Sequence, residues 1–298
     1  MLIHGHWAAQ PNVDSRAWQA CSTAACRRRT RVVQSAPFRR RVLDLPHNPF
    51  KHAIAAGRQQ IGLWCSLASH VSVEIVAGSG YDWLLLDTEH SPNEIPQVLS
   101  QLQAMMEHKV HPIVRPAWND MVLIKRFLDM GVQTLLLPVV NTAEEAAAAV
   151  ASTRYPPRGV RGFSGSSRSS RFGRVKDYHT RCEDEICVLV QVETQKGLDN
   201  LDAIVATEGV DGVFIGPGDL SAAIGYLGDQ NNPAVVDTII DMIGRIRAGG
   251  KAAGILTPDE NLARRYIEAG TTFTAVGSDL GLLARQSEAL ARRFKNGA

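Results

Sequence analysis

From residue 48 onward, short apolar runs alternate with amphipathic segments in one repeating order. The runs are rich in Val, Ile and Leu, which is typical of strands buried on both faces of a parallel sheet. The predicted strands are 61–67, 83–86, 110–114, 132–137, 188–192, 212–215, 252–256 and 273–276. Eight strand–helix units in about 250 residues predict an α/β fold, a closed (β/α)8 TIM barrel that forms a single domain over 48–298, rather than an open doubly wound sheet.

The predicted helices follow the strands at short intervals. Gly78 and Gly80 stop the first of them, and Asn119 is expected to cap the helix 120–129. A long loop is expected at 155–176. The other predicted helices are 72–77, 95–106, 143–152, 198–206, 234–248, 258–269 and a last one that ends near 294. No Gly-x-Gly-x-x-Gly motif follows the first strand, which argues further against a dinucleotide-binding sheet.

Composition agrees with a globular protein. The chain has 298 residues, of which 45% are hydrophobic and 21% are charged, so it can bury a full-size core. The most apolar stretch, 132–140, is strand-like and contains Pro138. A membrane-spanning helix needs about 20 consecutive apolar residues, so no membrane partner is expected.

Residues 1–47 are expected to form a basic, disordered extension, because they are rich in Arg, poor in acids and without a sustained period. Eight arginines and two aspartates give residues 1–45 a net charge of +6, which leaves −4 for the rest of a chain of net charge +2. The rest is not expected to bind nucleic acid. An unstructured tail or an upstream translation start is favoured for the extension. A transit peptide, or an Arg cluster that touches nucleic acid or membrane, stays open, whereas a secretory signal would need an apolar segment after the charges.

The five cysteines, Cys21, Cys26, Cys65, Cys182 and Cys187, do not suggest a disulfide framework. Their number is odd and no Cys-x-x-Cys spacing occurs, which favours a reducing compartment and argues against structural zinc. A cytoplasmic location is therefore expected.

Two carboxylates follow neighbouring predicted strands. Glu193 comes directly after the run 188–192, and Asp219 follows the run 212–215 after a short turn. Hard oxygen donors at adjacent strand ends suit Mg²⁺ or Mn²⁺, with positions left open for a substrate. Either acid alone could instead be a helix N-cap.

Further polar residues come at the ends of the second and third predicted strands. The second ends in Asp87-Thr-Glu-His90, and the third ends in Arg115 before a proline. Each has an ordinary interpretation, as a hydrogen-bonded turn or a surface ion pair. In a barrel, however, the carboxyl ends of the strands meet at one rim, so their convergence with Glu193 and Asp219 predicts an active site there.

Several strings of residues resemble the HpcH/HpaI aldolase family, the metal-dependent, class II pyruvate aldolases. The resemblance covers about residues 48–296, in the strings 80–90, 114–116, 118–120, 154–162, 191–194 and 214–221. It implies a carbon–carbon lyase (an aldehyde-lyase) that reversibly cleaves a 4-hydroxy-2-oxo acid to pyruvate and an aldehyde. The substrate would be of the 4-hydroxy-2-oxoheptanedioate or 2-keto-3-deoxy sugar-acid type.

The same resemblance implies roles for the rim residues. Glu193 and Asp219 match the ligands of a divalent metal (Mg²⁺, Mn²⁺ or Co²⁺) that acts as a Lewis acid on the ketoacid and stabilises the enolate. Arg115 matches the residue that donates to the oxo or enolate oxygen. His90 matches the general base for the C4 hydroxyl, and Asp87 is expected to orient its imidazole.

Other residues match family positions around the substrate. Gln191 matches a polar residue that lines the metal site, and the backbone N–H groups of Gly218 and Asp219 are expected to hold the substrate carboxylate. Asp129 matches a family acid near subunit contacts and the aldehyde. Arg168, in the loop 161–173, either closes over an anionic aldehyde or belongs to a mobile surface loop. The resemblance further implies a homo-hexamer, with 280–294 as a candidate contact.

Three alternatives remain open. Lys196, which follows Glu193 closely, could form a Schiff base, although the paired acids would then be unexplained. A lyase of the citrate lyase β-subunit type, acting on a CoA thioester, could use the same barrel and metal. A non-catalytic barrel that binds ketoacids would differ in class, and it predicts the loss of His90, Arg115 or a metal ligand, all of which are present.

Overall fold

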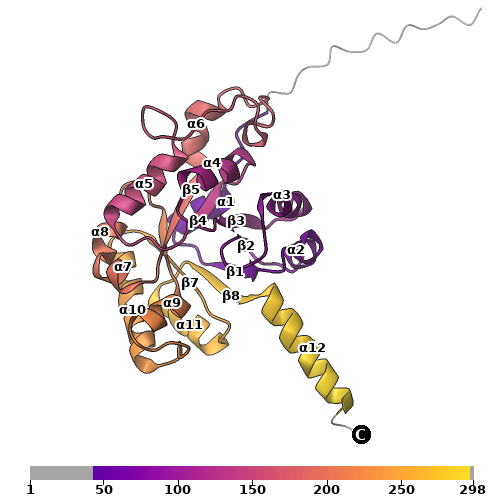
Figure 1. Ribbon diagram of the computed structural model, residues 1–298, viewed down its shortest axis with the longest axis vertical. Helices are drawn as coiled ribbons and strands as arrows, with labels where there is room; N and C mark the ends of the chain where they lie inside the picture. The colour runs from indigo at the N-terminus through magenta and orange to yellow at the C-terminus, as the bar shows by residue number, and fades with distance from the viewer. Residues whose placement is uncertain (1–42, 296–298) are drawn as a thin grey trace, which may run out of the picture. The chain divides into compact units, whose positions relative to one another are not determined.

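Eight parallel strands close into a barrel in the order β1 to β8 (Figure 1), in a computed structural model that describes residues 43–295. The strands are β1 (Gln60–Cys65), β2 (Trp83–Asp87), β3 (His111–Arg115), β4 (Thr134–Leu137), β5 (Cys187–Val192), β6 (Gly212–Ile215), β7 (Ala252–Leu256) and β8 (Phe273–Ser278). Pairing between β1 and β8, with Gln60 opposite Phe273, closes the ring. The predicted barrel is confirmed, and most predicted strands differ from the observed ones by one or two residues at an end.

Helices alternate with the strands and surround the barrel (Figure 1). Those that the sequence predicted are α2 (His70–Ala77), α3 (Ile95–Ala104), α4 (Met121–Asp129), α5 (Ala143–Thr153), α7 (Gln195–Asp199) with α8 (Leu201–Val205), α10 (Pro233–Ala248), α11 (Glu260–Ala269) and α12 (Asp279–Lys295). Two details of the prediction were wrong. The cap of α4 is Asp120, whose carboxylate accepts the N–H groups of Val122 and Leu123, and the expected helix 198–206 is divided into α7 and α8.

Three α-helices were not predicted: α1 (Pro49–Ala55), α6 (Tyr178–Glu185) and α9 (Pro217–Ala223). All three are short, and α6 buries little apart from Tyr178 and Cys182, so its sequence lacks an apolar stripe. In α9 the Pro-Gly pair resembles a turn, but proline is compatible with the first helical position. The expected loop 155–176 contains one 3-10 turn, η1 (Arg168–Ser170).

Large aromatic side chains fill the inside of the barrel. Trp83 and Phe273 occupy space that side chains would otherwise take at Gly62 and Gly254, because a Cβ at either glycine would overlap the facing ring. The interior cluster also includes Trp64, Leu85, Ile113, Leu136, Leu189 and Phe214. The barrel is therefore a packed core rather than a pore.

Helix α1 covers the amino-terminal ends of the strands. Phe50 is buried in the interior cluster, with its ring centroid 5.8 Å from that of Phe273 and 5.7 Å from that of His111. Asn48, fully buried, caps α1 by accepting the N–H of Lys51 and donates to Thr134 Oγ1. This short helix closes one end of the barrel and leaves the other end for chemistry.

Most of residues 1–47, including Cys21 and Cys26, lie outside the described part of the chain, so the predicted extension is not described. Cys65, Cys182 and Cys187 are buried free thiols, and burial raises the pKa of each of them. No helix among residues 43–295 is long and apolar enough to cross a membrane.

Helix α12 projects away from the barrel after β8 (Figure 1). Its first residue, Asp279, is buried and accepts the N–H of Ser66 at 2.8 Å. Beyond that turn its apolar side chains are exposed: Leu280, Leu282, Leu283, Leu290 and Phe294.

Candidate active site

Strand register places Arg115 beside Asp87. The two residues are partners in the β2–β3 pairing, each at the last position of its strand. Arg115 Nε and Nη2 donate to the two Asp87 oxygens at 2.9 and 2.7 Å, and Nη1 lies 2.8 Å from Glu89 Oε2. Trp64 Nε1 donates to Asp87 at 3.2 Å, and its ring lies 5.0 Å from the Arg115 guanidinium carbon. The guanidinium is fixed on several sides.

Glu193 follows β5 directly and is held by main chain and by Gln191. The backbone N–H of Val139 donates to Glu193 Oε1 at 3.0 Å, and Gln191 Nε2 donates to Oε2. Val139 has a φ of +55°, a conformation that costs energy for a β-branched residue. The strained residue is therefore the one whose N–H holds the Glu193 carboxylate in position.

A close approach of chain to side chain occurs at Gly216. A Cβ there would overlap Glu193 Oε2 and lie 2.8 Å from Glu193 Cβ. The next residues begin α9, which places Asp219 in its first turn with an exposed carboxylate. The glycine therefore lets β6 and α9 approach Glu193 closely enough for Asp219 to share its cavity.

The cavity at this end of the barrel has a volume of about 310 Å³. Its polar lining includes Arg115, Gln191, Glu193, Asp219 and Gln230. Its remaining lining residues are Trp64, Phe214, Gly216, Pro217, Gly218, Leu256 and Pro258. The space is of a size for a small ligand, and its lining combines charged and apolar groups.

Electrostatics in the cavity favour a cation. Burial, with the nearby carboxylates of Glu89 and Asp219, raises the pKa of Glu193 to about 7. Burial also raises the pKa of Glu89, although Arg115 opposes the shift. Burial acts in the same direction on Asp87, but the hydrogen bonds and charge of Arg115 outweigh it and lower the pKa of Asp87. Negative charge is thus compensated at Asp87 and under-compensated at Glu193.

His90 lies at the edge of the site. Its side chain is 67% exposed, and its Nε2 lies 4.0 Å from Glu89 Oε1. The Asp87 carboxylate accepts hydrogen bonds from Arg115, Trp64 and the Glu89 N–H, and none of the described hydrogen bonds joins it to the His90 imidazole that it was expected to orient. Asp87 positions Arg115 instead.

The structure does not bring Asp129 or Arg168 to this cavity. Asp129 ends α4 and pairs with the buried Arg161 at 3.1 Å. Arg168 donates to the carbonyl of Met130 at 2.6 Å, next to the residues that lead into β4. Both therefore lie near the amino-terminal end of β4, opposite the end that carries Glu193. The expected contact of Arg168 with the ligand is not made within one chain.

Some residues of the site were missed by sequence reasoning. Glu89 lies within residues 80–90, which carry the family resemblance, but its contact with Arg115 depends on strand pairing. Trp64, Phe214 and Leu256 have the appearance of ordinary strand residues. The one available signal for Phe214 and Leu256 was their position at or near the carboxyl end of a predicted strand, whereas Trp64 lies in the middle of the predicted strand 61–67.

Residues 60–286 match the family model described as HpcH/HpaI aldolase/citrate lyase. The chain belongs to this family. A "pyruvate aldolase" of Rhizobium etli is 59% identical over 252 residues, which cover 85% of this chain and 99% of that protein. A "hydroxypyruvate/pyruvate aldolase" of Deinococcus radiodurans is 56% identical, covering 85% of this chain and 92% of the relative.

A "4-hydroxy-2-oxo-heptane-1,7-dioate aldolase" of Klebsiella pneumoniae is also similar, with 55% identity over 85% of this chain and 96% of that protein. Among solved structures, a family member from Burkholderia cenocepacia superposes with a TM-score of 0.80 at 37% identity. It covers 83% of this chain and 99% of that one. The predicted family is confirmed.

Proposed function

We propose that the protein is a class II pyruvate aldolase that reversibly cleaves a 4-hydroxy-2-oxo acid to pyruvate and an aldehyde. The observation that carries this proposal is the cavity itself, which is lined by a fixed guanidinium and two carboxylates and has room for a small molecule. The names of two relatives support pyruvate as a product, and the name of a third supports a 4-hydroxy-2-oxo acid as the substrate.

The residues present fit a divalent cation. Glu193 and Asp219 supply hard oxygen ligands, and Gln191 Oε1 is buried without a hydrogen-bond partner among the described residues. The raised pKa of Glu193 also supports a cation site, since a nearby positive charge would favour the ionised carboxylate. Bound there, Mg²⁺, Mn²⁺ or Co²⁺ would polarise the 2-oxo group of the substrate.

Arg115 would stabilise negative charge that develops on the 2-oxo oxygen. Two of its five N–H donors bond to Asp87, and Nη1 is ion-paired with Glu89, so further donors are available to a ligand in the cavity. Because the guanidinium is already fixed, it needs no reorganisation during the reaction. The backbone N–H groups of Gly218 and Asp219 lie in the first turn of α9, where N–H groups have no partner within the helix, and they would hold the substrate carboxylate.

His90 would take the proton from the C4 hydroxyl, directly or through water. Its exposure at the rim keeps its ring in contact with solvent, so the proton can leave the site after cleavage. A Schiff-base mechanism finds less support. No lysine lines the cavity among the described residues, and Lys196 is exposed in α7.

Oligomer formation would complete the site and cover α12. The exposed leucines and Phe294 of this helix form an apolar surface of the kind that is buried between subunits. Asp129, remote from the cavity of its own chain, would then approach the aldehyde region of another copy. A homo-hexamer, as the family resemblance implies, is the proposed assembly.

The decisive experiment is deuterium exchange at the pyruvate methyl group in D₂O, followed by NMR. Exchange should occur with Mg²⁺ or Mn²⁺, stop with EDTA, and fall at least 100-fold in Asp219→Asn. Asp199→Asn, at an exposed position in α7, is the matched control and should behave as the parent protein. Metal-independent exchange, or a Lys adduct trapped by borohydride with pyruvate, would contradict the metal mechanism. No exchange at all would indicate a ketoacid-binding protein.

A further inference from the structure

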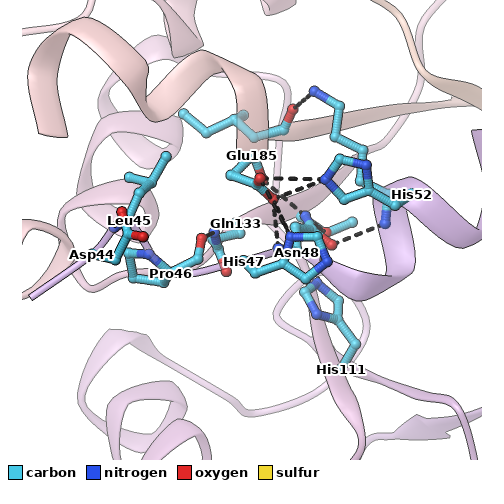
Figure 2. Close-up of polar contacts among 12 residues, drawn as sticks. Asp44, Leu45, Pro46, His47, Asn48, His52, His111, Gln133 and Glu185 are labelled. Carbon is cyan, nitrogen blue, oxygen red and sulfur yellow. Dashed lines mark hydrogen bonds and ion pairs between the residues drawn. The ribbon is translucent and has the colours of Figure 1, made fainter.

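A second cluster of metal-ligating side chains lies at the amino-terminal end of the barrel (Figure 2). His47 precedes α1, His52 lies within it, and Glu185 is the last residue of α6. The two histidine nitrogens and a carboxylate oxygen of Glu185 lie within 4.8 Å of one another. The imidazole rings are stacked, with centroids 4.5 Å apart and an interplanar angle of 18°. Both rings turn a nitrogen toward the same carboxylate.

The distances match those between ligands of one metal ion. His47 Nδ1 and His52 Nε2 lie 3.4 and 3.2 Å from the same oxygen, Glu185 Oε2. With Zn–N and Zn–O bonds of about 2.0–2.1 Å, the ligand atoms of a tetrahedral site are about 3.3 Å apart. Small rotations of exposed imidazoles would complete the geometry, since His47 and His52 are 65% and 48% exposed.

The carboxylate in the cluster is held in place by main chain. The backbone N–H of Asn48 donates to Glu185 Oε2 at 2.6 Å, and the Asn48 side chain donates to the Glu185 carbonyl at 2.9 Å. Lys51, the neighbouring cation, bonds to the carbonyls of Glu183 and Ile186 and faces Asp211. The Lys51 ammonium therefore does not occupy the cluster, and the Glu185 carboxylate between the two histidines is held in place before any metal binds.

We propose that His47, His52 and Glu185 form a second metal site that takes a borderline transition ion (Zn²⁺, Co²⁺, Ni²⁺ or Cu²⁺), with solvent in the remaining position. Two imidazoles and one carboxylate suit these ions, whereas Mg²⁺ prefers all-oxygen surroundings. Each imidazole binds as a neutral ring through the nitrogen that faces Glu185, with its proton on the other nitrogen.

This site is separate from the cavity at Glu193. Glu185 precedes β5 and Glu193 follows it, so a strand of six residues, about 20 Å long, lies between them. A metal at His47 and His52 links the start of α1 to the end of α6. Because α1 closes the barrel through Phe50, such a link stabilises the folded state by preferential binding.

The test uses the full chain in a His4→Gln/His6→Gln background, because the His-Gly-His sequence near the start could chelate the same ions. Zn²⁺ titrated calorimetrically in excess Mg²⁺ should bind at this site with a micromolar dissociation constant. His52→Gln should remove one equivalent of binding or weaken it at least 30-fold. His70→Gln, an exposed histidine at the start of α2, is the matched control and should bind like the background protein.

Cu²⁺ electron paramagnetic resonance gives an independent readout of the ligands. Nitrogen splitting from two imidazoles should appear in the background protein, and from one imidazole in His52→Gln. In melting curves, Zn²⁺ should raise the melting temperature of the background protein by several degrees more than that of His52→Gln. Equal stoichiometry and affinity in His52→Gln and the background would overturn the proposal. So would the absence of nitrogen splitting in a protein whose circular dichroism shows that it is folded.

Discussion

Two glutamates bracket β5, and they have opposite electrostatic surroundings. Glu193, at the carboxyl end, is 4% exposed, and burial among carboxylates raises its pKa to about 7. Glu185, at the amino end, is also partly buried, but hydrogen bonds from Asn48 and the two histidines outweigh this and lower its pKa. The negative charge of Glu193 lacks a compensating positive charge nearby, whereas the charge of Glu185 is stabilised by hydrogen bonds from the protein. The comparison teaches that one end of the barrel is built for chemistry and the other for stability.

The contrast also bears on the two proposed metal sites. At Glu193 a cation would compensate buried negative charge that the protein leaves unpaired. At Glu185 an ion would compete with hydrogen bonds that already exist, so binding there should be weaker.

The largest expected effect comes from replacing Glu193 with glutamine, with the same replacement at Glu185 as the comparison. Glu193→Gln should lower kcat/KM for retro-aldol cleavage by about 10³-fold, or about 4 kcal/mol, because it removes a charged ligand from the reaction centre. Glu185→Gln should change kcat/KM less than threefold. Steady-state kinetics at fixed Mg²⁺ would measure both, and a Glu193→Gln enzyme with a tenth of the parent activity would break the comparison.

The stability of the amino end should depend on Phe50. Phe50→Ala removes a ring packed between Trp83 and Phe273 and should lower the free energy of unfolding by about 3–4 kcal/mol. The folded fraction should retain its kcat. Phe172→Ala, at an exposed ring, should cost less than about 0.5 kcal/mol by the same urea titration. Equal losses for the two variants would show that α1 does not close the core.

Alanine substitutions at two glycines distinguish an effect on the position of Glu193 from an effect on the free energy of unfolding. Gly216→Ala should lower kcat/KM about 30-fold, because its Cβ overlaps the Glu193 carboxylate and displaces it. Gly244→Ala lies in the middle of α10 with open space around it, and should raise the free energy of unfolding by about 0.5–1 kcal/mol with unchanged kinetics. If Gly216→Ala kept full activity, close approach at this residue would not position the ligand.

The smallest effect is a pH dependence at the amino end. Burial lowers the pKa of His111 to about 3, while the unfolded value is about 6.5. The unfolded state therefore binds more protons below pH 6.5, and the contribution of His111 to stability, present above that pH, is lost as pH falls toward 3. At pH 5 the loss should be about 2 kcal/mol relative to pH 7.

His111→Gln keeps a polar partner for Thr134 but cannot titrate, so its stability should fall less between pH 7 and pH 5. Melting curves at both pH values would show the difference, with the exposed His70→Gln as control. Identical pH profiles for His111→Gln and the parent would contradict a neutral buried imidazole.

Much of the fold could be predicted because its signals are local. Apolar runs of the right length located all eight strands, and β6 and β7 were predicted with their observed bounds. Short helices were missed because seven or eight residues give too little periodicity to recognise. The cap of α4 was placed one residue early, since Asn119 and Asp120 are both good caps and only backbone geometry selects between them.

The site was predictable where it depended on strand ends and not where it depended on neighbours. Glu193, Arg115 and Asp219 line one cavity, as their positions after predicted strands had suggested. The spacing of Asp87 and His90 suggested a local contact, but the pairing of β2 with β3 places Arg115 beside Asp87, and Arg115 donates hydrogen bonds to its carboxylate.

The sequence by itself determined the order of strands and helices, the rim on which the acids meet and the family to which the chain belongs. Only the tertiary structure decided which charges are compensated, that Arg168 and Asp129 lie far from the cavity of their own chain, and that two histidines meet a glutamate more than 130 residues away. The reason is physical. Secondary structure follows from periodicity along the chain, whereas pKa, ligand geometry and ion pairing depend on distances and burial that arise when remote segments pack together.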